Sequence, residues 1–293
     1  MQRRHRKLIE IAPSPSLSVR LREEIIDAAV RVAKAAGYHS LGTIEFLLDE
    51  ESQGDFVFIE ANARLQVEHT ATEEVHGVDL VQAQLRIAGG ATLAELGVNH
   101  ALVARGYAIQ ARVNLERMEP DGNVRPAGGM LTLYEPPAGP GVRVDGYGYA
   151  GYATNANFDS LLAKVVVHSS SEDFRDAVKR CERALAEFEI GGVETNLPFL
   201  RNVVAHGDFS QGLVYTRWLA TTSQSSRRSM TRPPTLPRGA TARRVPTSIC
   251  VTPWPRWSSI AKGRALGPAA PRPRPRSPAR PTLSRWARRC RAP

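Results

Sequence analysis

The sequence has few cysteines and lacks any long apolar run. It contains 3 cysteines, and two of them, Cys250 and Cys290, lie near its carboxyl end. This excludes a disulfide framework and a cysteine-ligated metal site, and it favours a reducing, cytoplasmic compartment. No stretch approaches the roughly 18 apolar residues that a transmembrane helix requires. Because Glu10 and Pro13 interrupt the amino-terminal stretch, we expect neither a signal peptide nor a membrane partner.

Acidic residues are absent from the last quarter of the chain. From Thr222 onward there are 17 of the 39 Lys and Arg residues and 13 of the 21 prolines, which leaves 22 basic against 29 acidic residues in 1–221. We therefore expect residues 220–293 to form a disordered basic tail. Its composition is typical of a GC-rich gene read out of frame, and a frameshift is the preferred hypothesis. A tail that binds RNA or DNA is the alternative, but the acidic body argues against nucleic acid as a partner.

The body of the chain alternates between helical and extended patterns. Its 42% apolar content is enough for a folded core. Apolar spacing predicts a helix over 18–36, preceded by Ser18 and ended by Gly37. The other expected elements are a hairpin of residues 43–48 and 56–60, a helix from Asp79 to 88, strands at 107–113 and 164–168, and a helix from about 174 that buries Cys181. The fold class is therefore α+β, with a β-rich part from about residue 102.

The most informative stretch is residues 60–69. In it, Glu60, Asn62, Arg64, Gln66 and Glu68 alternate with apolar residues, so in an extended chain they share one face. A solvated edge strand is the simpler explanation. Such faces favour Thr, Ser and Lys, however, whereas carboxylates, amides and a guanidinium are the groups that hold a metal ion, phosphate or a small oxyanion.

Two further features extend this candidate site. The hairpin can bring Glu45 beside Glu60, and two neighbouring carboxylates repel each other unless a cation such as Mg²⁺ lies between them. A pair of carboxylates that faces solvent is an equally good interpretation. At the amino terminus Arg3, His5 and Lys7 share a parity, so a strand there would have a basic face that is either solvated or directed at a polyphosphate.

These residues resemble a known family. The segments 2–7, 42–46 and 58–69 are similar, in order and spacing, to the second half of the ATP-grasp domain of biotin carboxylases. The segments 106–114, 126–129, 141–143, 149–152, 158–164 and 195–196 resemble the biotin carboxylase C-terminal domain. The resemblance implies the C-terminal part of an ATP-grasp domain at 1–90, a linker at 91–103, a β-rich C-terminal domain at 104–219, and the tail at 220–293.

The resemblance also implies an activity and a set of site residues. ATP and bicarbonate would form carboxyphosphate, whose CO₂ is then captured by N1 of biotin. Glu68, Arg64 and Arg112 would be catalytic: Glu68 would deprotonate bicarbonate if burial raises its pKa, and Arg112 would stabilise the biotin enolate. Bicarbonate would be bound by Lys7, Arg64, Gln66, the Val67 backbone and Glu68; the nucleotide by Gln2, His5, Glu45 and Glu60; biotin by Arg112 and Asp159; and Mg²⁺ or Mn²⁺ by Glu45, Glu60 and Asn62.

Partners and limits follow from the same resemblance. Biotin would arrive on a separate carrier domain, a carboxyltransferase component would use the carboxybiotin, and the family forms homodimers in which Arg143 matches an interface position. The first half of the ATP-grasp domain is missing from the match, so we do not expect this chain alone to catalyse the reaction. Residues 115–122 resemble larger multidomain carboxylases, and the final acceptor stays open. The alternative is another ATP-grasp ligase, such as a carbamoyl-phosphate synthase, against which Arg112 and Phe158–Asp159 argue.

Overall fold

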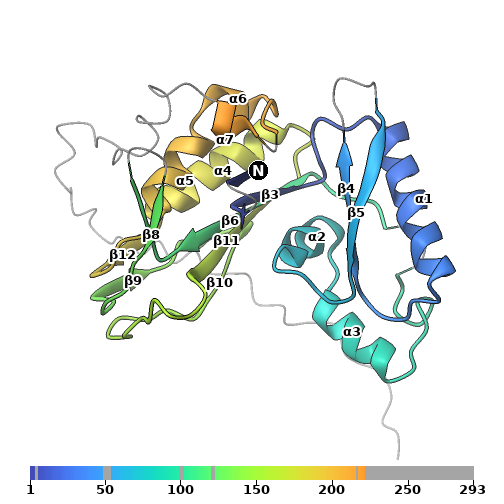
Figure 1. The fold of residues 1–293 in the computed structure, drawn as a ribbon, viewed down its shortest axis with the longest axis horizontal. Coiled ribbons are helices and arrows are strands. Elements are labelled where there is room, and N and C mark those ends of the chain that lie inside the picture. Colours follow the sequence, from blue (N-terminus) through green and yellow to red (C-terminus); the bar gives the residue numbers. More distant parts are fainter. Residues whose placement is uncertain (4–5, 49–53, 99–101, 120–122, 216, 222–293) are drawn as a thin grey trace, which may run out of the picture. The chain divides into compact units, whose positions relative to one another are not determined.

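The computed structural model describes residues 1–3, 6–48, 54–98, 102–119, 123–215 and 217–221. These residues form an α+β fold, as predicted (Figure 1). The expected tail lies outside the described residues from position 222 onward. The strands are β1 (Gln2–Arg3), β2 (Arg6–Lys7), β3 (Ile9–Ala12), β4 (Thr43–Leu48), β5 (Phe56–Asn62), β6 (Tyr107–Asn114), β7 (Glu116–Met118), β8 (Val124–Pro126), β9 (Leu133–Glu135), β10 (Val142–Gly146), β11 (Leu161–Ser169) and β12 (Glu189–Gly191). The helices are α1 (Val19–Ala35), α2 (His69–His76), α3 (Leu80–Ala88), α4 (Phe174–Glu187), α5 (Leu197–Val204), α6 (Gly207–Ser210) and α7 (Trp218–Thr221).

A four-stranded antiparallel sheet in the order β10-β11-β6-β3 organises the chain around the site. Strand β3 belongs to the part that resembles an ATP-grasp domain, and β6 belongs to the part that resembles the C-terminal domain. The two sequence regions therefore share one sheet, in which Glu10 lies opposite Gln110 and Arg112 lies opposite Lys164.

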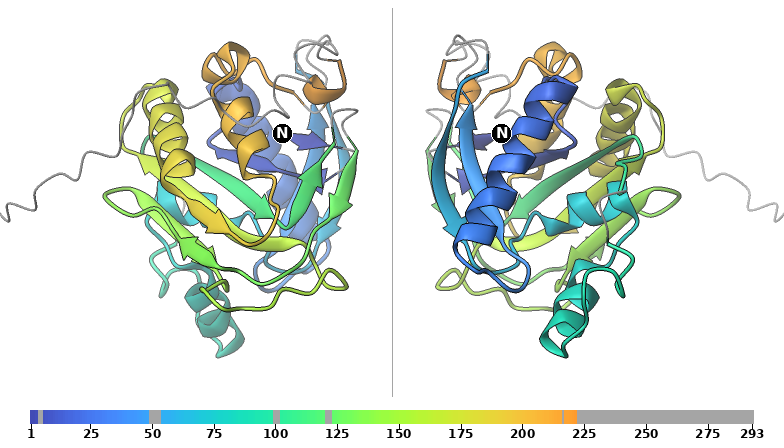
Figure 2. Two further views of the ribbon diagram at one scale, coloured as in Figure 1. Left: turned by 90° about the vertical axis from the view of Figure 1, so that its left-hand side faces the viewer. Right: turned by 90° about the vertical axis from the view of Figure 1, so that its right-hand side faces the viewer.

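The two faces of this sheet have different neighbours. Side chains alternate along a strand, so Ile109, Ala111 and Val113 of β6 point together into the largest apolar cluster, which α4 and α5 complete. On the other face Ala108 packs against Ala71 and Val75 of α2. Figure 2 shows the sheet with the helices α4 and α5 beside it. The same parity gives Gln110 and Arg112 to the face of α2, where the polar site is built.

The expected helices and hairpin around the site are confirmed. Helix α1 begins after Ser18, whose hydroxyl accepts a hydrogen bond from the Leu21 N–H, and α3 begins after Asp79, whose carboxylate accepts one from the Gln82 N–H at 2.7 Å. Strands β4 and β5 pair antiparallel as the predicted hairpin. Helix α2 ends at Gly77, whose positive φ of 66° is the left-handed conformation that favours glycine.

Cys181, the cysteine in the body of the chain, is part of the core. Cys181 lies in the interior of α4, as predicted, and burial raises the pKa of its thiol to about 12. The thiol is therefore a structural core group and not a reactive one.

None of the helices in the described ranges is long and apolar enough to cross a membrane.

The apolar cluster between α4 and the sheet allows a direct test of the fold. Leu185 is fully buried in the cluster between α4 and the sheet. We expect Leu185→Ala to lower the free energy of unfolding by about 2–5 kcal/mol, because it removes apolar contacts and leaves a cavity. Urea unfolding followed by circular dichroism measures this. Leu213→Ala, at a side chain that is 59% exposed, is the matched control and should cost much less; equal losses would contradict the assigned core.

Candidate functional site

The stretch that carries the candidate residues does not stay extended, and this part of the prediction was wrong. Strand β5 ends at Asn62, and the chain then turns, with the Arg64 N–H donating to the Asn62 carbonyl at 2.8 Å. The His69 N–H donates to the Gln66 carbonyl at 3.2 Å, where α2 begins. Because a turn replaces the strand, the polar side chains after Asn62 converge by folding back and not by alternation along one face.

The amino-terminal strand also differs from the expectation. Residues 2–7 form a short antiparallel pair in which Gln2 lies opposite Lys7 and Arg3 lies opposite Arg6. A common face of Arg3, His5 and Lys7 on one strand is therefore wrong, because the chain reverses between β1 and β2. His5 itself lies outside the described residues. The reversal places Gln2 beside Lys7, and Lys7 and Arg6 both line the cavity of the site.

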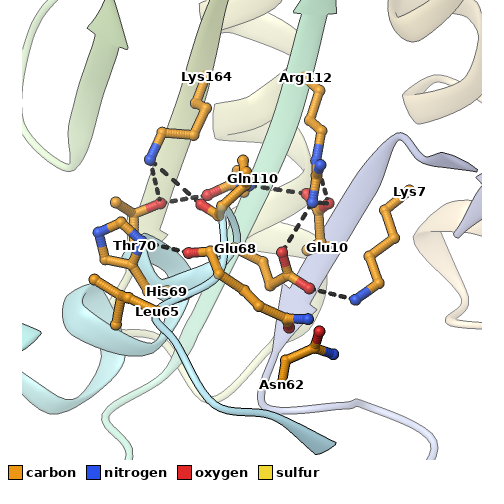
Figure 3. A network of polar contacts seen from close by, with 12 residues as sticks. Lys7, Glu10, Asn62, Leu65, Glu68, His69, Thr70, Gln110, Arg112 and Lys164 are labelled. Carbon is orange, nitrogen blue, oxygen red and sulfur yellow. Dashed lines mark hydrogen bonds and ion pairs between the residues drawn. The ribbon is translucent and has the colours of Figure 1, made fainter. Parts of the chain in front are cut away.

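The centre of the site is an alternating chain of acids and bases (Figure 3). The Lys7 ammonium donates to Glu45 at 2.8 Å and to Glu68 at 2.5 Å. The other oxygen of Glu68 accepts from Nη2 of Arg112 at 3.0 Å, and Oε1 of Glu10 accepts from Nε of Arg112 at 2.6 Å. Three carboxylates thus surround two cations. A bound cation, or an exchange of partners among these side chains, would change the balance of charge at the site.

The pKa values in this cluster bear on whether burial raises the pKa of Glu68. Burial alone would raise the pKa of Glu68, but the hydrogen bond from Lys7 and the charges of Lys7 and Arg112 lower it below its usual value. Burial, Lys7 and Gln66 act on Glu45 in the same way, and its pKa is also lowered. For Glu10 burial prevails over Arg112, and the pKa is raised. Burial therefore does not raise the pKa of Glu68 toward neutrality in this arrangement, which was the condition set for its role as a base.

The lowered pKa values predict a pH dependence. A carboxylate with a lowered pKa stabilises the fold above its ordinary value, 4.5 for Glu45 and Glu68, and that contribution is lost as the pH falls through the lowered value. We expect Lys7→Met to lower the free energy of unfolding by a constant amount from pH 5 to 8 and by a shrinking amount below pH 4.5. Urea midpoints across this range measure the difference, and a difference that grew in acid would contradict the assignment.

Most of the predicted site residues meet at one cavity of about 840 Å³. Gln66 is 8% exposed, and its amide nitrogen donates to Glu45 at 2.8 Å, while its buried Oε1 has no hydrogen-bond partner among the described residues. A buried acceptor without a partner indicates a missing donor. Of the predicted bicarbonate- and biotin-binding residues, the cavity is lined by Lys7, Arg64, Gln66, Val67, Glu68, Arg112 and Asp159.

The predicted metal ligands lie beside this cavity and do not line it. Glu45 and Glu60 are cross-strand neighbours in the β4–β5 pair, and Asn62 donates to Glu60 at 2.8 Å and to Glu45 at 3.4 Å. Two carboxylates and an amide oxygen suit a hard cation such as Mg²⁺. Within the described residues no three His, Cys, Asp or Glu side chains form a metal-binding group, so the third protein ligand would be the amide of Asn62.

Four residues of the network were missed by sequence reasoning. Glu10, Thr70, Gln110 and Lys164 connect to the site through hydrogen bonds (Figure 3). Gln110 and Arg112 share a parity within the predicted strand at 107–113, and this was a usable signal. Glu10, Thr70 and Lys164 come from β3, α2 and β11. Because they are far apart in the sequence, no local pattern indicated that they belong to one network.

Comparison with known proteins identifies the family. Residues 110–221 match the family model described as "Biotin carboxylase C-terminal domain", and residues 1–96 match "Carbamoyl-phosphate synthase L chain, ATP binding domain". Biotin carboxylase 1 of Bacillus subtilis is 42% identical over 222 residues, which are 75% of this chain and 48% of that protein. The chain belongs to the biotin carboxylase family. The relatives include members in which a biotin carboxylase region is part of a larger protein: a pyruvate carboxylase of Pichia angusta is 44% identical over 221 residues, 75% of this chain and 18% of that one.

A solved structure agrees with this assignment. The biotin carboxylase domain dimer of Hydrogenobacter thermophilus 2-oxoglutarate carboxylase, in complex with MgADP, ADP and bicarbonate, has 40% sequence identity and a TM-score of 0.70. The match covers 75% of this chain and 47% of that chain. The chain thus spans about half the length of a biotin carboxylase and less than a fifth of a pyruvate carboxylase.

Proposed function

We propose that this chain carries the bicarbonate, metal and biotin positions of an ATP-dependent biotin carboxylase. The supporting observation is the cavity where Lys7, Glu68 and Arg112 meet the buried Gln66 amide. In the proposed reaction an oxygen of bicarbonate attacks the γ-phosphorus of ATP, which gives carboxyphosphate and ADP. Carboxyphosphate then breaks down to CO₂ and phosphate, the phosphate takes the proton of biotin N1, and the deprotonated N1 captures the CO₂.

Bicarbonate would bind between Lys7, Arg64 and Gln66. The two cations match the charge of the anion. Bicarbonate also carries one O–H group, which would donate to the Glu68 carboxylate. The Val67 N–H would contribute a further donor.

Glu68 would act as the base for bicarbonate. Its pKa is lowered because Lys7 and Arg112 both contact it. An anion bound next to it would take over part of the hydrogen bonding of both cations and would add a repelling charge. Both effects would raise the pKa of Glu68. Glu68 would therefore be a stronger base when bicarbonate is bound, which is when it has to accept the proton.

A divalent cation would be held by Glu45, Glu60 and Asn62, where it would neutralise charge on the ATP phosphates. Lys7 shares Glu45 with this group, so metal and bicarbonate positions would be adjacent. Gln2 lies opposite Lys7 in the β1–β2 pair. By the family resemblance, Gln2 and His5 would both lie near the nucleotide. Mg²⁺ and Mn²⁺ both suit these ligands.

Biotin would be held by Arg112 and Asp159 in the same cavity. Nη1 of Arg112 has no hydrogen-bond partner within the described part of the chain, while its other nitrogens contact Glu10 and Glu68. A free guanidinium N–H at the cavity can stabilise the oxygen of the biotin enolate. Asp159 accepts a hydrogen bond from the Leu161 N–H at 2.9 Å, which fixes its side chain at the start of β11.

The partners are proposed from the same family. They are a biotin-carrier domain, a carboxyltransferase component and a second copy of the carboxylase. The face around Arg143 would contact that copy; Arg143 binds Glu73 at 2.8 Å and Asp145 at 2.8 Å and is therefore held in place. The proposed domain limits are those implied by the resemblance, and the final acceptor of the carboxyl group is left open.

The test is biotin-stimulated, bicarbonate-dependent ATP hydrolysis. The 293-residue chain is joined to the amino-terminal half of Biotin carboxylase 1 of Bacillus subtilis and compared with the chain alone. We expect stimulation by free biotin in the joined protein and none in the chain alone, because water would reach carboxyphosphate in an open site. Failure of the joined, folded protein to hydrolyse ATP with bicarbonate would contradict the proposal.

A carbamoyl-phosphate synthase-like ligase is the second candidate, because residues 1–96 match that ATP-binding domain model. It would form a carboxyphosphate of the same kind but transfer nitrogen to it. It predicts stimulation by ammonia and not by biotin. The match of residues 110–221 to the biotin carboxylase C-terminal domain favours the first proposal.

A further inference from the structure

Glu10 occupies a position at the site that the proposed reaction does not use. It lies on β3 directly opposite Gln110 of β6, and its side chain is 12% exposed. The Arg112 N–H donates to the Leu8 carbonyl at 2.9 Å, so the backbone fixes β3 and β6 at this point. Arg112 and Gln110 have the same parity on β6, and both side chains reach the Glu10 carboxylate.

The two oxygens of Glu10 are bound to different partners. Nε and Nη2 of Arg112 both lie 2.6 Å from Oε1, and the Gln110 amide donates to Oε2 at 3.1 Å. Gln110 in turn accepts from the Thr70 hydroxyl, which lies 3.5 Å from the Lys164 ammonium. Lys164 also donates to the Val67 carbonyl at 3.3 Å. Glu10 therefore joins Arg112 to the turn that carries Val67.

Stability alone is a poor explanation for this ion pair. A buried ion pair contributes little compared with apolar residues of the same shape, because both charges lose their hydration. An arginine near a single carboxylate also tends to form two parallel hydrogen bonds with it. Without Glu10, the Nε edge of Arg112 would lose its anchor, and the guanidinium would be free to rotate about its contact with Glu68. With Glu10 present, Arg112 gives one contact to Glu68, and it lines the cavity with no hydrogen-bond partner for its Nη1 among the described residues.

We propose that Glu10 is a positioning residue that fixes the orientation of the Arg112 guanidinium at the cavity. This rests on the proposed function in so far as Arg112 serves biotin, but the orientation itself can be measured on the chain without any turnover. Glu10 touches no substrate in this arrangement and acts through Arg112.

Nuclear magnetic resonance of the 293-residue chain tests the orientation. The Nε–H signal of Arg112, identified by its loss in Arg112→Lys, is expected to exchange slowly with water because Glu10 holds it in a buried ion pair. Glu10→Gln should shift this signal and speed its exchange roughly 10-fold or more, since a charge-assisted hydrogen bond becomes a neutral one. Glu73→Gln removes a buried carboxylate from another arginine pair, that of the partly exposed Arg143; it is the control and should leave the Arg112 signal unchanged.

An unchanged Arg112 signal in folded Glu10→Gln would overturn the proposal. If Glu10→Gln does not fold, Glu10→Asp carries the test, because it keeps the charge but shortens the reach. We then expect a shifted Arg112 signal with faster exchange, and an unchanged one would again overturn the proposal. Backbone spectra of each variant report whether the chain is folded.

A kinetic readout separates positioning from a general structural role. In the joined protein, Glu10→Gln should lower kcat/KM for biotin roughly 10- to 100-fold, as expected for a misplaced catalytic group. Bicarbonate-dependent ATP hydrolysis without biotin should change about 2-fold at most, because it does not need Arg112 in its biotin-binding orientation. Equal losses in both assays would overturn the positioning role. An inactive wild-type protein would instead contradict the proposed function and leave the resonance result standing.

Discussion

Glu68→Gln should lower the rate of biotin carboxylation by about 10²- to 10⁴-fold in the joined protein, the range expected when a general base is removed. The amide keeps the size of the side chain but cannot take a proton from bicarbonate. It also relieves the contacts of Lys7 and Arg112 with a carboxylate, so bicarbonate binding should be retained or strengthened. Steady-state kinetics with bicarbonate as the varied substrate separate the two effects.

The control for this prediction is Glu172→Gln. Glu172 is an exposed residue before α4, outside the cavity, and its substitution removes one negative charge from the surface. We expect wild-type kinetics. A fully active Glu68→Gln protein would show that another group takes the proton.

Lys7→Met should lower kcat/KM for bicarbonate by about 10²- to 10³-fold, comparable to the loss of one preorganised donor at a site of developing charge. Lys7 separates Glu45 from Glu68, with contacts at 2.8 and 2.5 Å. Without it the two carboxylates face the anion unshielded. The loss should appear in the KM for bicarbonate as well as in kcat, because the charge is present in both the ground state and the transition state.

The matched control is Lys179→Met, which removes an ammonium that is 74% exposed on α4. A surface pair of this kind contributes little to stability. Its kinetics should equal those of the wild type. Loss of activity in Lys179→Met as large as that in Lys7→Met would mean that net charge, and not the position of Lys7, controls bicarbonate use.

Local patterns predicted the elements of this fold well. Ser18 and Asp79 cap the helices that their sequence positions indicated, and the hairpin of β4 and β5 brings Glu45 beside Glu60 as expected. These features depend on contacts within a few residues or across one turn. The burial of α1 was not predictable in the same way: Val32, one of the apolar residues whose spacing predicted the helix, is 37% exposed, because periodicity specifies a face and not what covers it.

The parts of the site that were missed depend on long-range contacts. Glu10 meets Gln110 and Arg112 across about 100 positions of sequence, and no spacing rule predicts that β3 joins the sheet of β6. The turn after Asn62 was also missed, because alternation of polar and apolar residues is compatible with a strand until hydrogen bonds such as that from Arg64 to Asn62 bend the chain. The family resemblance supplied Arg112, but it supplied neither Glu10 nor this turn.

Transfer of label from ¹³C-bicarbonate to biotin is the most direct measurement of the central proposal. The joined protein is incubated with ATP, Mg²⁺, free biotin and ¹³C-bicarbonate, and carboxybiotin is detected by nuclear magnetic resonance at alkaline pH. We predict ¹³C-carboxybiotin in amounts that match ADP, and none without ATP or in Glu68→Gln over the same time. ATP hydrolysis by the wild type without labelled carboxybiotin, or with labelled product only when ammonia replaces biotin, would contradict it.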